Sequence, residues 1–332
     1  MSLPRVIVIC PPDRDPPPVD RLSDEAEFVI VRTAEELRAA QPGVEILFLN
    51  DFRTDLLRIV GPGDLRWIHT SSIGVDALLT DAIIESGLIV STSRDVCERP
   101  IAEWVLGVLL MFVKDLRRTL ELQQIAQWVH RETEPLEGRR VLLLGPGPVG
   151  REIATLLSAA RMTVDVVGRR RREDPELGQI HAIDDLDELL PEADDVVLAL
   201  PLNDSTRRII DARRLALMRP GARLVNVGRG ALVDEAALVA AAGEGRLDAA
   251  ALDVFEREPL PANHPFWVMS NVFVSPHMSG DLVGWRHRVV DRFAANLRRW
   301  INGEPLADVV DLREHGASAP ALVDKAVPIS GA

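Results

Sequence analysis

The stretch VLLLGPGPVGREIATLLSAA, residues 141–160, indicates how the chain folds. It is typical of a buried strand over 141–145, a G-x-G-x-x-G loop and an amphipathic helix. In such a loop Gly145 allows a tight turn, Gly147 lets the backbone approach a pyrophosphate, and Gly150 permits close packing of helix and strand. The positive end of the helix dipole then faces the phosphates. The stretch therefore predicts a dinucleotide-binding unit.

The end of the next expected strand, residues 163–167, indicates which dinucleotide is bound. An NAD protein would place an acidic residue there to bind the ribose 2′-hydroxyl. This chain has Arg169 and Arg170 instead, and the nearby Asp165 lies too early in the strand to reach the ribose. Because arginine pairs bidentately with phosphate, the 2′-phosphate of NADP is the expected partner, so NADP(H) is favoured and NAD(H) is possible. The residues that follow are expected to form a solvated loop: Arg171, Arg172, Glu173 and Asp174.

The same alternation of strand and helix continues along most of the chain. Short apolar and β-branched runs, typical of buried strands, alternate with helical patterns. Such alternation predicts mainly parallel sheets covered by helices. We therefore expect an α/β fold with two Rossmann-like or flavodoxin-like domains. The expected strands span residues 6–10, 28–31, 45–49, 66–70 and 88–92 in a first series, and 141–145, 163–167, 196–200, 223–227, 249–254 and 272–276 in a second.

Two long helical patterns, at residues 101–120 and 282–301, mark where the chain passes between these domains. The residues after the second pattern are too few for a domain of their own. We therefore expect the chain to leave the first domain along one helix and return along the other, which makes the first domain discontinuous. The tail beyond Asp311 is expected to lie over the surface or over a partner. The expected division is 1–100 with 284–332 for a substrate domain, and 101–283 for a dinucleotide-binding domain.

Composition and charge exclude several classes of protein. The 332 residues carry a formal net charge of −13, which argues against a nucleic-acid partner. The longest apolar run, residues 104–113, is well short of the roughly 20 residues that a membrane span needs, so we expect a buried helix and no membrane association. Cys10 and Cys97 imply no disulfide framework, and the amino-terminal residues lack a signal-peptide pattern, so a cytoplasmic protein is expected. The histidines show no ligand spacing, and no metal is expected.

Three further stretches place reactive side chains after expected strands. Arg229 follows the run LVNV, Glu258 follows LDV, and His277 follows VFVSP. Ligands of open α/β sheets bind at the carboxyl ends of parallel strands, so these side chains are expected at one site. An arginine can bind a substrate carboxylate, and a histidine can move a proton. A carboxylate can orient that histidine and favour its charged form.

These motifs resemble those of the D-isomer-specific 2-hydroxyacid dehydrogenases. The glycine loop, NVGRGALVDEAAL, ALDVFEREPLP and SPHMSG follow one another in the order and at the spacing of that family. SSIGVDAL (71–78) and IAEWVLGVLLM (101–111) are similar to its earlier motifs. The resemblance covers residues 45–312. It implies the interleaved two-domain architecture and a homodimer held together by the cofactor domains.

The resemblance also implies a role for individual residues. Arg229, Glu258 and His277 would be catalytic, and the backbone amides of Ile73 and Gly74, with Arg229, would hold the substrate carboxylate. A hydride would pass from the nicotinamide to the carbonyl carbon of a 2-oxo acid, while protonated His277 donates to the carbonyl oxygen and Glu258 stabilises the imidazolium. The cofactor-binding residues would be Gly145, Gly147, Pro148 (which lacks an N–H donor), Val149, Gly150, Arg169, Arg170, Pro201, Thr206, Val227, Gly228, Asp253 and Gly280.

Glyoxylate and hydroxypyruvate are the first expected substrates, because NADPH suits the reduction of small 2-oxo acids. Formate dehydrogenases of the family carry glutamine where Glu258 stands, and phosphite dehydrogenases use a lysine near the G-V-D turn that is absent here. The alternative function is cofactor sensing, as in the family's transcriptional corepressors, although neither a long disordered tail nor a basic patch supports it. The motifs leave the pocket shape open, and Trp128 from a second subunit is one candidate for shaping it.

Overall fold

The computed structural model describes residues 3–12, 14–50, 64–75, 78 and 81–312. The chain divides into two compact units, unit 1 (Met1–Val96 with Leu282–Ala332) and unit 2 (Cys97–Asp281). Unit 1 is discontinuous, as predicted. The tail beyond Asp311, for which a position over the surface or a partner was expected, lies almost wholly outside the described residues. Within the described part of the chain, no helix combines the length and apolar character needed to cross a membrane.

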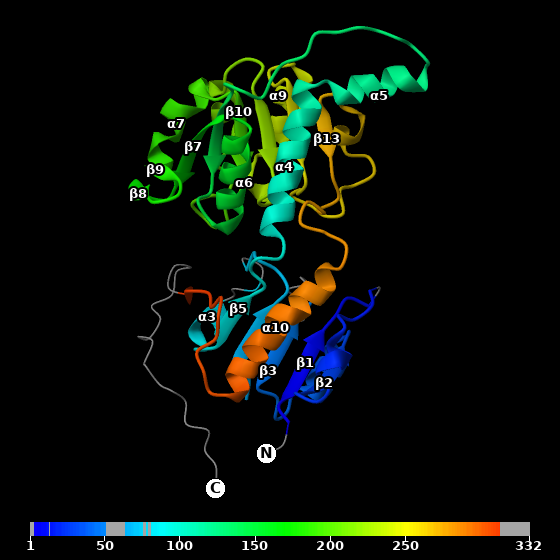
Figure 1. Ribbon diagram of the computed structural model, residues 1–332, viewed down its shortest axis with the longest axis vertical. Coiled ribbons are helices and arrows are strands. Elements are labelled where there is room, and N and C mark those ends of the chain that lie inside the picture. Colours follow the sequence, from blue (N-terminus) through cyan, green and yellow to red (C-terminus); the bar gives the residue numbers. More distant parts are fainter. Residues whose placement is uncertain (1–2, 13, 51–63, 76–77, 79–80, 313–332) are drawn as a thin grey trace. The chain divides into compact units, whose positions relative to one another are not determined.

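Unit 1 is built on a five-stranded parallel sheet with the order β2-β1-β3-β4-β5 (Figure 1). This is the strand order of flavodoxin-like folds. Its strands are largely apolar runs because strands of a covered parallel sheet are buried on both faces. The elements are β1 (Arg5–Ile9), η1 (Val19–Leu22), β2 (Glu27–Val31), α1 (Ala34–Ala40), β3 (Ile46–Leu49), β4 (Trp67–Thr70), α3 (Asp81–Glu85), β5 (Ile89–Thr92) and α10 (Trp285–Ile301).

Helix α10 is held against this sheet by aromatic side chains. The ring of Phe293 stacks on Phe48, with the ring centroids 4.6 Å apart, and on Trp67 at 5.4 Å. Val289 and Leu297, one turn to either side on the same helix face, are fully buried. The apolar face predicted for residues 282–301 is thereby confirmed.

A buried histidine ties the neighbouring strands β4 and β5 together. The Nδ1 of His69 lies 2.8 Å from the Ser91 hydroxyl, and its Nε2 lies 3.0 Å from the Ser93 hydroxyl. The Ser93 hydroxyl also donates to the carbonyl oxygen of Thr70. Burial lowers the pKa of His69 to about 3, so the ring is neutral and acts as a structural connector.

Unit 2 is built on an eight-stranded sheet with the order β13-β12-β11-β10-β6-β7-β9-β8, parallel except between β8 and β9. Helices α4 and α6 cover one buried apolar face, and α7, α8 and α9 cover the other (Figure 1). The elements are α4 (Glu98–Val113), α5 (Leu116–Gln124), β6 (Arg140–Leu144), α6 (Pro148–Ala159), β7 (Thr163–Gly168), β8 (Arg172–Asp174), β9 (Gly178–Ala182), η2 (Ile183–Asp185), α7 (Leu186–Leu189), η3 (Leu190–Glu192), β10 (Asp195–Leu198), α8 (Ala212–Leu217), β11 (Arg223–Asn226), η4 (Gly230–Leu232), α9 (Glu235–Gly243), β12 (Ala249–Leu252), η5 (Pro265–Val268) and β13 (Val272–Val274).

Two expectations for this part of the chain are wrong. The helix predicted over 101–120 is two helices, because Asp115 adopts a left-handed backbone conformation with φ 47° between α4 and α5. The stretch Arg172–Asp174 is the edge strand β8, which pairs antiparallel with β9, and not a solvated loop. Its side chains are charged and largely exposed, so no apolar pattern marked it as a strand.

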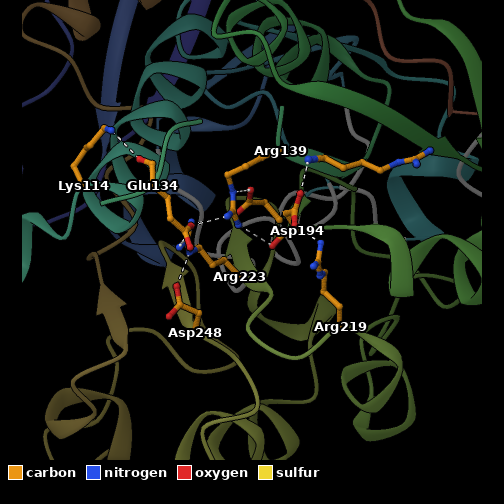
Figure 2. Close-up of polar contacts among 9 residues, drawn as sticks. Lys114, Glu134, Arg139, Asp194, Arg219, Arg223 and Asp248 are labelled. Atoms are coloured by element: carbon orange, nitrogen blue, oxygen red, sulfur yellow. Dashed lines mark hydrogen bonds and ion pairs between the residues drawn. The ribbon is translucent and has the colours of Figure 1, made fainter. Parts of the chain in front are cut away.

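Ion pairs connect the amino ends of the central strands of unit 2 (Figure 2). The Nε of Arg139, just before β6, donates to Oδ2 of Asp195 at the start of β10, at 2.9 Å. Oε2 of Glu134 accepts from Arg139 Nη1 at 2.8 Å and from Arg223 Nη2 at 3.0 Å. Arg223 also donates to Asp248 at 2.7 Å. The network therefore links the segment before β6 to the starts of β10 and β11.

The burial of this network makes its pairing important for stability. The side chain of Asp195 is fully buried, and burial raises its pKa although the hydrogen bond and charge of Arg139 act in the opposite direction. A buried carboxylate that loses its partner is strongly destabilising. Arg139 is thus the residue on which the ionised form of Asp195 depends.

Replacing Arg139 with Met should therefore lower the free energy of unfolding by about 3–5 kcal/mol, because Asp195 stays buried without its main partner. Urea unfolding followed by circular dichroism measures the change. Arg161→Met is the matched control, since the pair between Arg161 and Glu137 is largely exposed and contributes far less. Equal urea midpoints for the two variants would contradict the assignment.

Candidate active site

The glycine loop between β6 and α6 has the close approaches that its sequence predicts. Gly145 has φ 122°, and a Cβ there would lie 2.5 Å from the carbonyl oxygen of Ala199. A Cβ on Gly150 would lie 1.8 Å from the carbonyl oxygen of Gly145, whereas one on Gly147 would meet nothing within 4 Å. Helix α6 begins at Pro148, where a missing N–H costs no intrahelical bond. The loop thus combines tight internal packing with open space at Gly147.

Two arginines follow the end of β7 at Gly168. Arg169 and Arg170 are exposed, and neither side chain has a hydrogen bond or ion pair with another described residue. The next residue, Arg171, does have a partner, since its guanidinium group pairs with Asp185 at 2.9 Å. The first two guanidinium groups are therefore the ones available to an anionic ligand.

Two aspartates near these arginines in the sequence are engaged with other partners. Oδ2 of Asp165 lies 2.5 Å from Nε of Arg140, in mid-strand. Asp174 accepts from Arg151 at 2.9 Å, and this hydrogen bonding holds its pKa well below the usual range. Neither carboxylate is placed to take the role of a ribose-binding acid.

The turn that carries Arg229 is shaped by the last residue of β11. Asn226 is buried, and its amide group donates to the carbonyl oxygen of Arg229 at 2.9 Å and accepts from the N–H of Gly228 at 3.1 Å. A Cβ on Gly230 would lie 1.9 Å from the carbonyl carbon of Phe255. This glycine lets the turn pack directly on the loop that leads to Glu258. The sequence analysis missed Asn226, although it directly precedes the glycine-flanked turn.

Glu258 and His277 form a hydrogen-bonded pair. Oε2 of Glu258 lies 2.7 Å from Nδ1 of His277, and its Oε1 accepts from the N–H of Phe255 at 3.0 Å. The hydrogen bond that His277 donates to Glu258 raises the pKa of His277, against the opposing effects of burial and of the Arg229 charge. Burial disfavours ionisation of Glu258, but His277 and the Phe255 amide outweigh it and lower the pKa of the carboxyl group. The pair therefore favours an imidazolium next to a carboxylate.

The turn that carries His277 is held by Asp253, one residue past the end of β12. Oδ1 of this buried carboxylate accepts from the Ser275 hydroxyl at 2.6 Å and from the Met278 amide at 2.9 Å, and Oδ2 accepts from the Ser279 amide at 2.9 Å. His277 has φ 53°, an uncommon conformation for a residue other than glycine. The placement of Asp253 at the cofactor stays a prediction, and its described hydrogen bonds give it a further role in shaping the histidine turn.

The other predicted residues fall in both units. In unit 2 the Thr206 hydroxyl donates to the carbonyl oxygen of Pro201 at 2.7 Å and so shapes the loop after β10. Ile73 and Gly74 belong to unit 1, just after β4, and are half-buried. All the remaining predicted residues belong to unit 2, including Val149 in the first turn of α6, the buried pair Val227 and Gly228, and Gly280.

The Glu258–His277 pair can be tested without any substrate. The ring pKa of His277, followed by NMR across pH, should lie above the usual 6.5 in the unmodified protein and fall in Glu258→Gln, because the carboxylate charge no longer favours the cation. Glu256→Gln is the control, since Glu256 faces Arg208. An unchanged His277 titration in Glu258→Gln would refute the coupling.

Comparison with known proteins shows which family this chain resembles. Residues 106–279 match the NAD binding domain of the D-isomer specific 2-hydroxyacid dehydrogenases. Glyoxylate reductase from Thermofilum pendens is 32% identical over 271 residues, which cover 80% of this chain and 76% of that protein. D-3-phosphoglycerate dehydrogenase from Methanocaldococcus jannaschii is 28% identical over 87% of this chain, but the match spans only 56% of that longer protein.

Two solved structures superpose on nearly the whole of this chain. A D-isomer specific 2-hydroxyacid dehydrogenase from Xanthobacter autotrophicus Py2, in complex with NADPH and MES, is 27% identical and superposes with a TM-score of 0.77 over 93% of this chain and 98% of its own. A family protein from Aeromonas salmonicida is 30% identical, with a TM-score of 0.79 over 93% and 99%. The motifs, the split architecture and these relatives lead to one conclusion: the chain belongs to the D-isomer specific 2-hydroxyacid dehydrogenase family of NAD(P)-dependent oxidoreductases.

Proposed function

We propose that this protein reduces a small 2-oxo acid, glyoxylate or hydroxypyruvate, to the 2-hydroxy acid with NADPH. The observation that carries the proposal is the 2.7 Å hydrogen bond between Glu258 and His277 beside the charge of Arg229. A histidine held in its charged form can protonate a carbonyl oxygen as hydride arrives at carbon. The glyoxylate reductase from Thermofilum pendens supports this choice of substrate class.

In this proposal each residue has a separate chemical role. Bound NADPH supplies the hydride. Nε2 of His277 donates a proton to the carbonyl oxygen, while Glu258 at Nδ1 keeps the ring charged and oriented. Arg229 polarises the carbonyl oxygen and binds the substrate carboxylate, together with the backbone amides of Ile73 and Gly74. The reverse reaction, oxidation of the 2-hydroxy acid, needs His277 in its neutral form.

Unit 2 would hold the cofactor through its glycine loop and the end of β7. The open space at Gly147 and the free amides of the first turn of α6 suit a pyrophosphate. Arg169 and Arg170 suit a 2′-phosphate, because their guanidinium groups have no other described partner. The Xanthobacter relative, crystallised with NADPH, supports the same cofactor.

A panel of 2-oxo acids assayed with NADPH and with NADH tests the proposed function. Glyoxylate or hydroxypyruvate should be reduced, and His277→Ala should lower the rate by about 10²–10⁴-fold, as for other general acids. If no 2-oxo acid is reduced with either cofactor, the proposal is wrong and cofactor sensing gains support.

Replacing Arg169 and Arg170 together with Ala should weaken NADPH binding by roughly 1.5–3 kcal/mol for each charge-assisted bond lost, before any re-solvation, and should leave NADH binding much less affected. Isothermal titration with each cofactor measures the difference. Arg172→Ala is the matched control, because that side chain lies exposed on β8. A protein that already prefers NADH before substitution would overturn the assignment to NADP(H).

We also propose that the active form is a homodimer. Much of the uncharged stretch 104–113 packs within unit 2, but an apolar surface remains beyond it. Its exposed side chains lie on α5 and just after it: Leu116, Leu120, Ile125, Trp128 and Val129. Exposed apolar patches of this kind mark protein–protein interfaces.

Analytical ultracentrifugation at micromolar concentration should therefore show a species of twice 36.6 kDa. Introducing charge with Leu120→Glu should shift it toward the monomer, because a buried unpaired carboxylate opposes association. Leu3→Glu, at an exposed leucine of unit 1, is the control. A single species near 36.6 kDa for the unmodified protein would reject the dimer.

A further inference from the structure

The loop between β12 and η5, which carries Glu258, is bound by a second carboxylate from elsewhere in unit 2. Oε2 of Glu235, in the first turn of α9, accepts from the N–H of Glu256 at 3.2 Å. The preceding N–H of the same loop, that of Phe255, donates to Glu258 at 3.0 Å. Two consecutive amides of the loop therefore bind two carboxylates, one that pairs with His277 and one that belongs to a helix.

The peptide group that links Phe255 to Glu256 is also held by the turn after β11. A Cβ on Gly230 would lie 1.9 Å from the carbonyl carbon of Phe255 and 2.3 Å from the nitrogen of Glu256. The turn therefore packs directly on this peptide group, while Glu235 binds its N–H. These two contacts fix the orientation of the peptide group, and with it the direction of the adjoining Phe255 amide that binds Glu258.

The other oxygen of Glu235 lies close to the far end of the same loop. Nε2 of His264 lies 3.0 Å from Oε1 of Glu235, and Nδ1 of His264 accepts from the N–H of Phe266 at 3.3 Å, in η5. The side chains of His264 and Glu235 are largely buried, at 16% and 19% exposed. A carboxylate can accept at both of its oxygens, whereas an amide side chain has one accepting oxygen and one donating nitrogen. Glutamate thus suits both contacts, and glutamine suits only one of them.

We propose that Glu235 is a positioning residue for Glu258, acting through the amide of Glu256, and that His264 holds Glu235 in place. The inference rests on the proposed function, in which Glu258 keeps the ring of His277 charged and oriented. Groups that take part in a reaction must be held close to their productive geometry by hydrogen bonds from surrounding residues. The carboxylate of Glu235 supplies such a bond to the loop.

The titration of His277 in Glu235→Gln tests this role. The glutamine amide leaves one of the two contacts without an acceptor, so the loop should shift and weaken the bond between Glu258 and His277. The pKa of His277, followed by NMR, should then fall, but by less than in Glu258→Gln, because the charge of Glu258 remains. The kcat for reduction should fall about tenfold, since a displacement of about 1 Å can cost about 10²-fold, and the KM for NADPH should stay unchanged.

Asp234→Ala is the matched control, because Asp234 caps α9 by accepting from the N–H of Ala237 at 3.1 Å. Its ion pair with the exposed Arg208, at 3.7 Å, contributes little. A glutamate in the first turn of a helix also favours the helix dipole, and a role confined to helix stability would make the Glu235 and Asp234 variants alike. Asp234→Ala should lower the midpoint of urea unfolding and leave the pKa of His277 as it was. Equal falls of that pKa in the two variants would overturn the positioning role.

Two substitutions of His264 provide a second test, which decides if Glu235→Gln does not fold as judged by circular dichroism. The longer side chain in His264→Gln can still donate to Glu235, whereas the shorter one in His264→Asn can only replace the acceptor for the Phe266 amide. The pKa of His277 should therefore fall in His264→Asn and change much less in His264→Gln. Equal titrations of His277 in these two variants would overturn the inference.

The outcomes separate this inference from the proposed function. The titration of His277 needs no substrate, so it tests the positioning role whether or not a 2-oxo acid is reduced. An unchanged pKa of His277 in Glu235→Gln would overturn the inference while the reductase proposal stands. A lowered pKa in a protein that reduces no 2-oxo acid would support the positioning of Glu258 and defeat the proposed function alone.

Discussion

The parallel pairing of β10, β11, β12 and β13 is the constraint on which the candidate site depends. The pairs Leu198–Asn226 and Asn226–Leu252 lie side by side at the ends of these strands, so the turns that follow leave the sheet at one edge. Residues far apart in the sequence are thereby brought into one set of turns.

The charged side chains at the two edges of this sheet have different roles. At the amino edge the charged groups around Arg139 are paired with one another, whereas at the carboxyl edge the pairing with Glu258 favours the protonated form of His277.

The geometry of the carboxyl edge is fixed by side chains that need not touch a substrate. Asn226 shapes the arginine turn, and Asp253 holds the histidine turn by three hydrogen bonds to residues 275–279. Gly230 allows one turn to pack against the backbone of the next loop. The positive φ of His277 is maintained because Asp253 bonds to residues on both sides of it. The candidate site is thus preorganised by hydrogen bonds to the backbone, which suits the proposed reaction because little reorganisation would remain for it.

Much of this was predictable from sequence, for physical reasons that also explain the misses. Strands buried on both faces read as continuous apolar runs, which is why the strands of both sheets except β8 and β9 were recognised. The charged edge strand β8 gave no such signal. His277 and Glu258 were predicted because reactive side chains after parallel strands are expected at one edge. The roles of Asn226 and Asp253 lie in bonds to backbone atoms of particular turns, and no residue pattern encodes the shape of a turn in advance.

The central claim is that the carboxylate of Glu258 sets the protonation of His277 during turnover. The most direct measurement is the pH dependence of kcat/KM for reduction and for oxidation in Glu258→Gln, which keeps a hydrogen-bonding group and removes the charge. Because the lower pKa of His277 depletes the acid form sooner, the alkaline limb of reduction should move to lower pH. Oxidation, which needs the neutral ring, should extend to lower pH. If neither limb moves while His277→Ala is inactive, the carboxylate only supports the fold of the loop, and the charge coupling is contradicted.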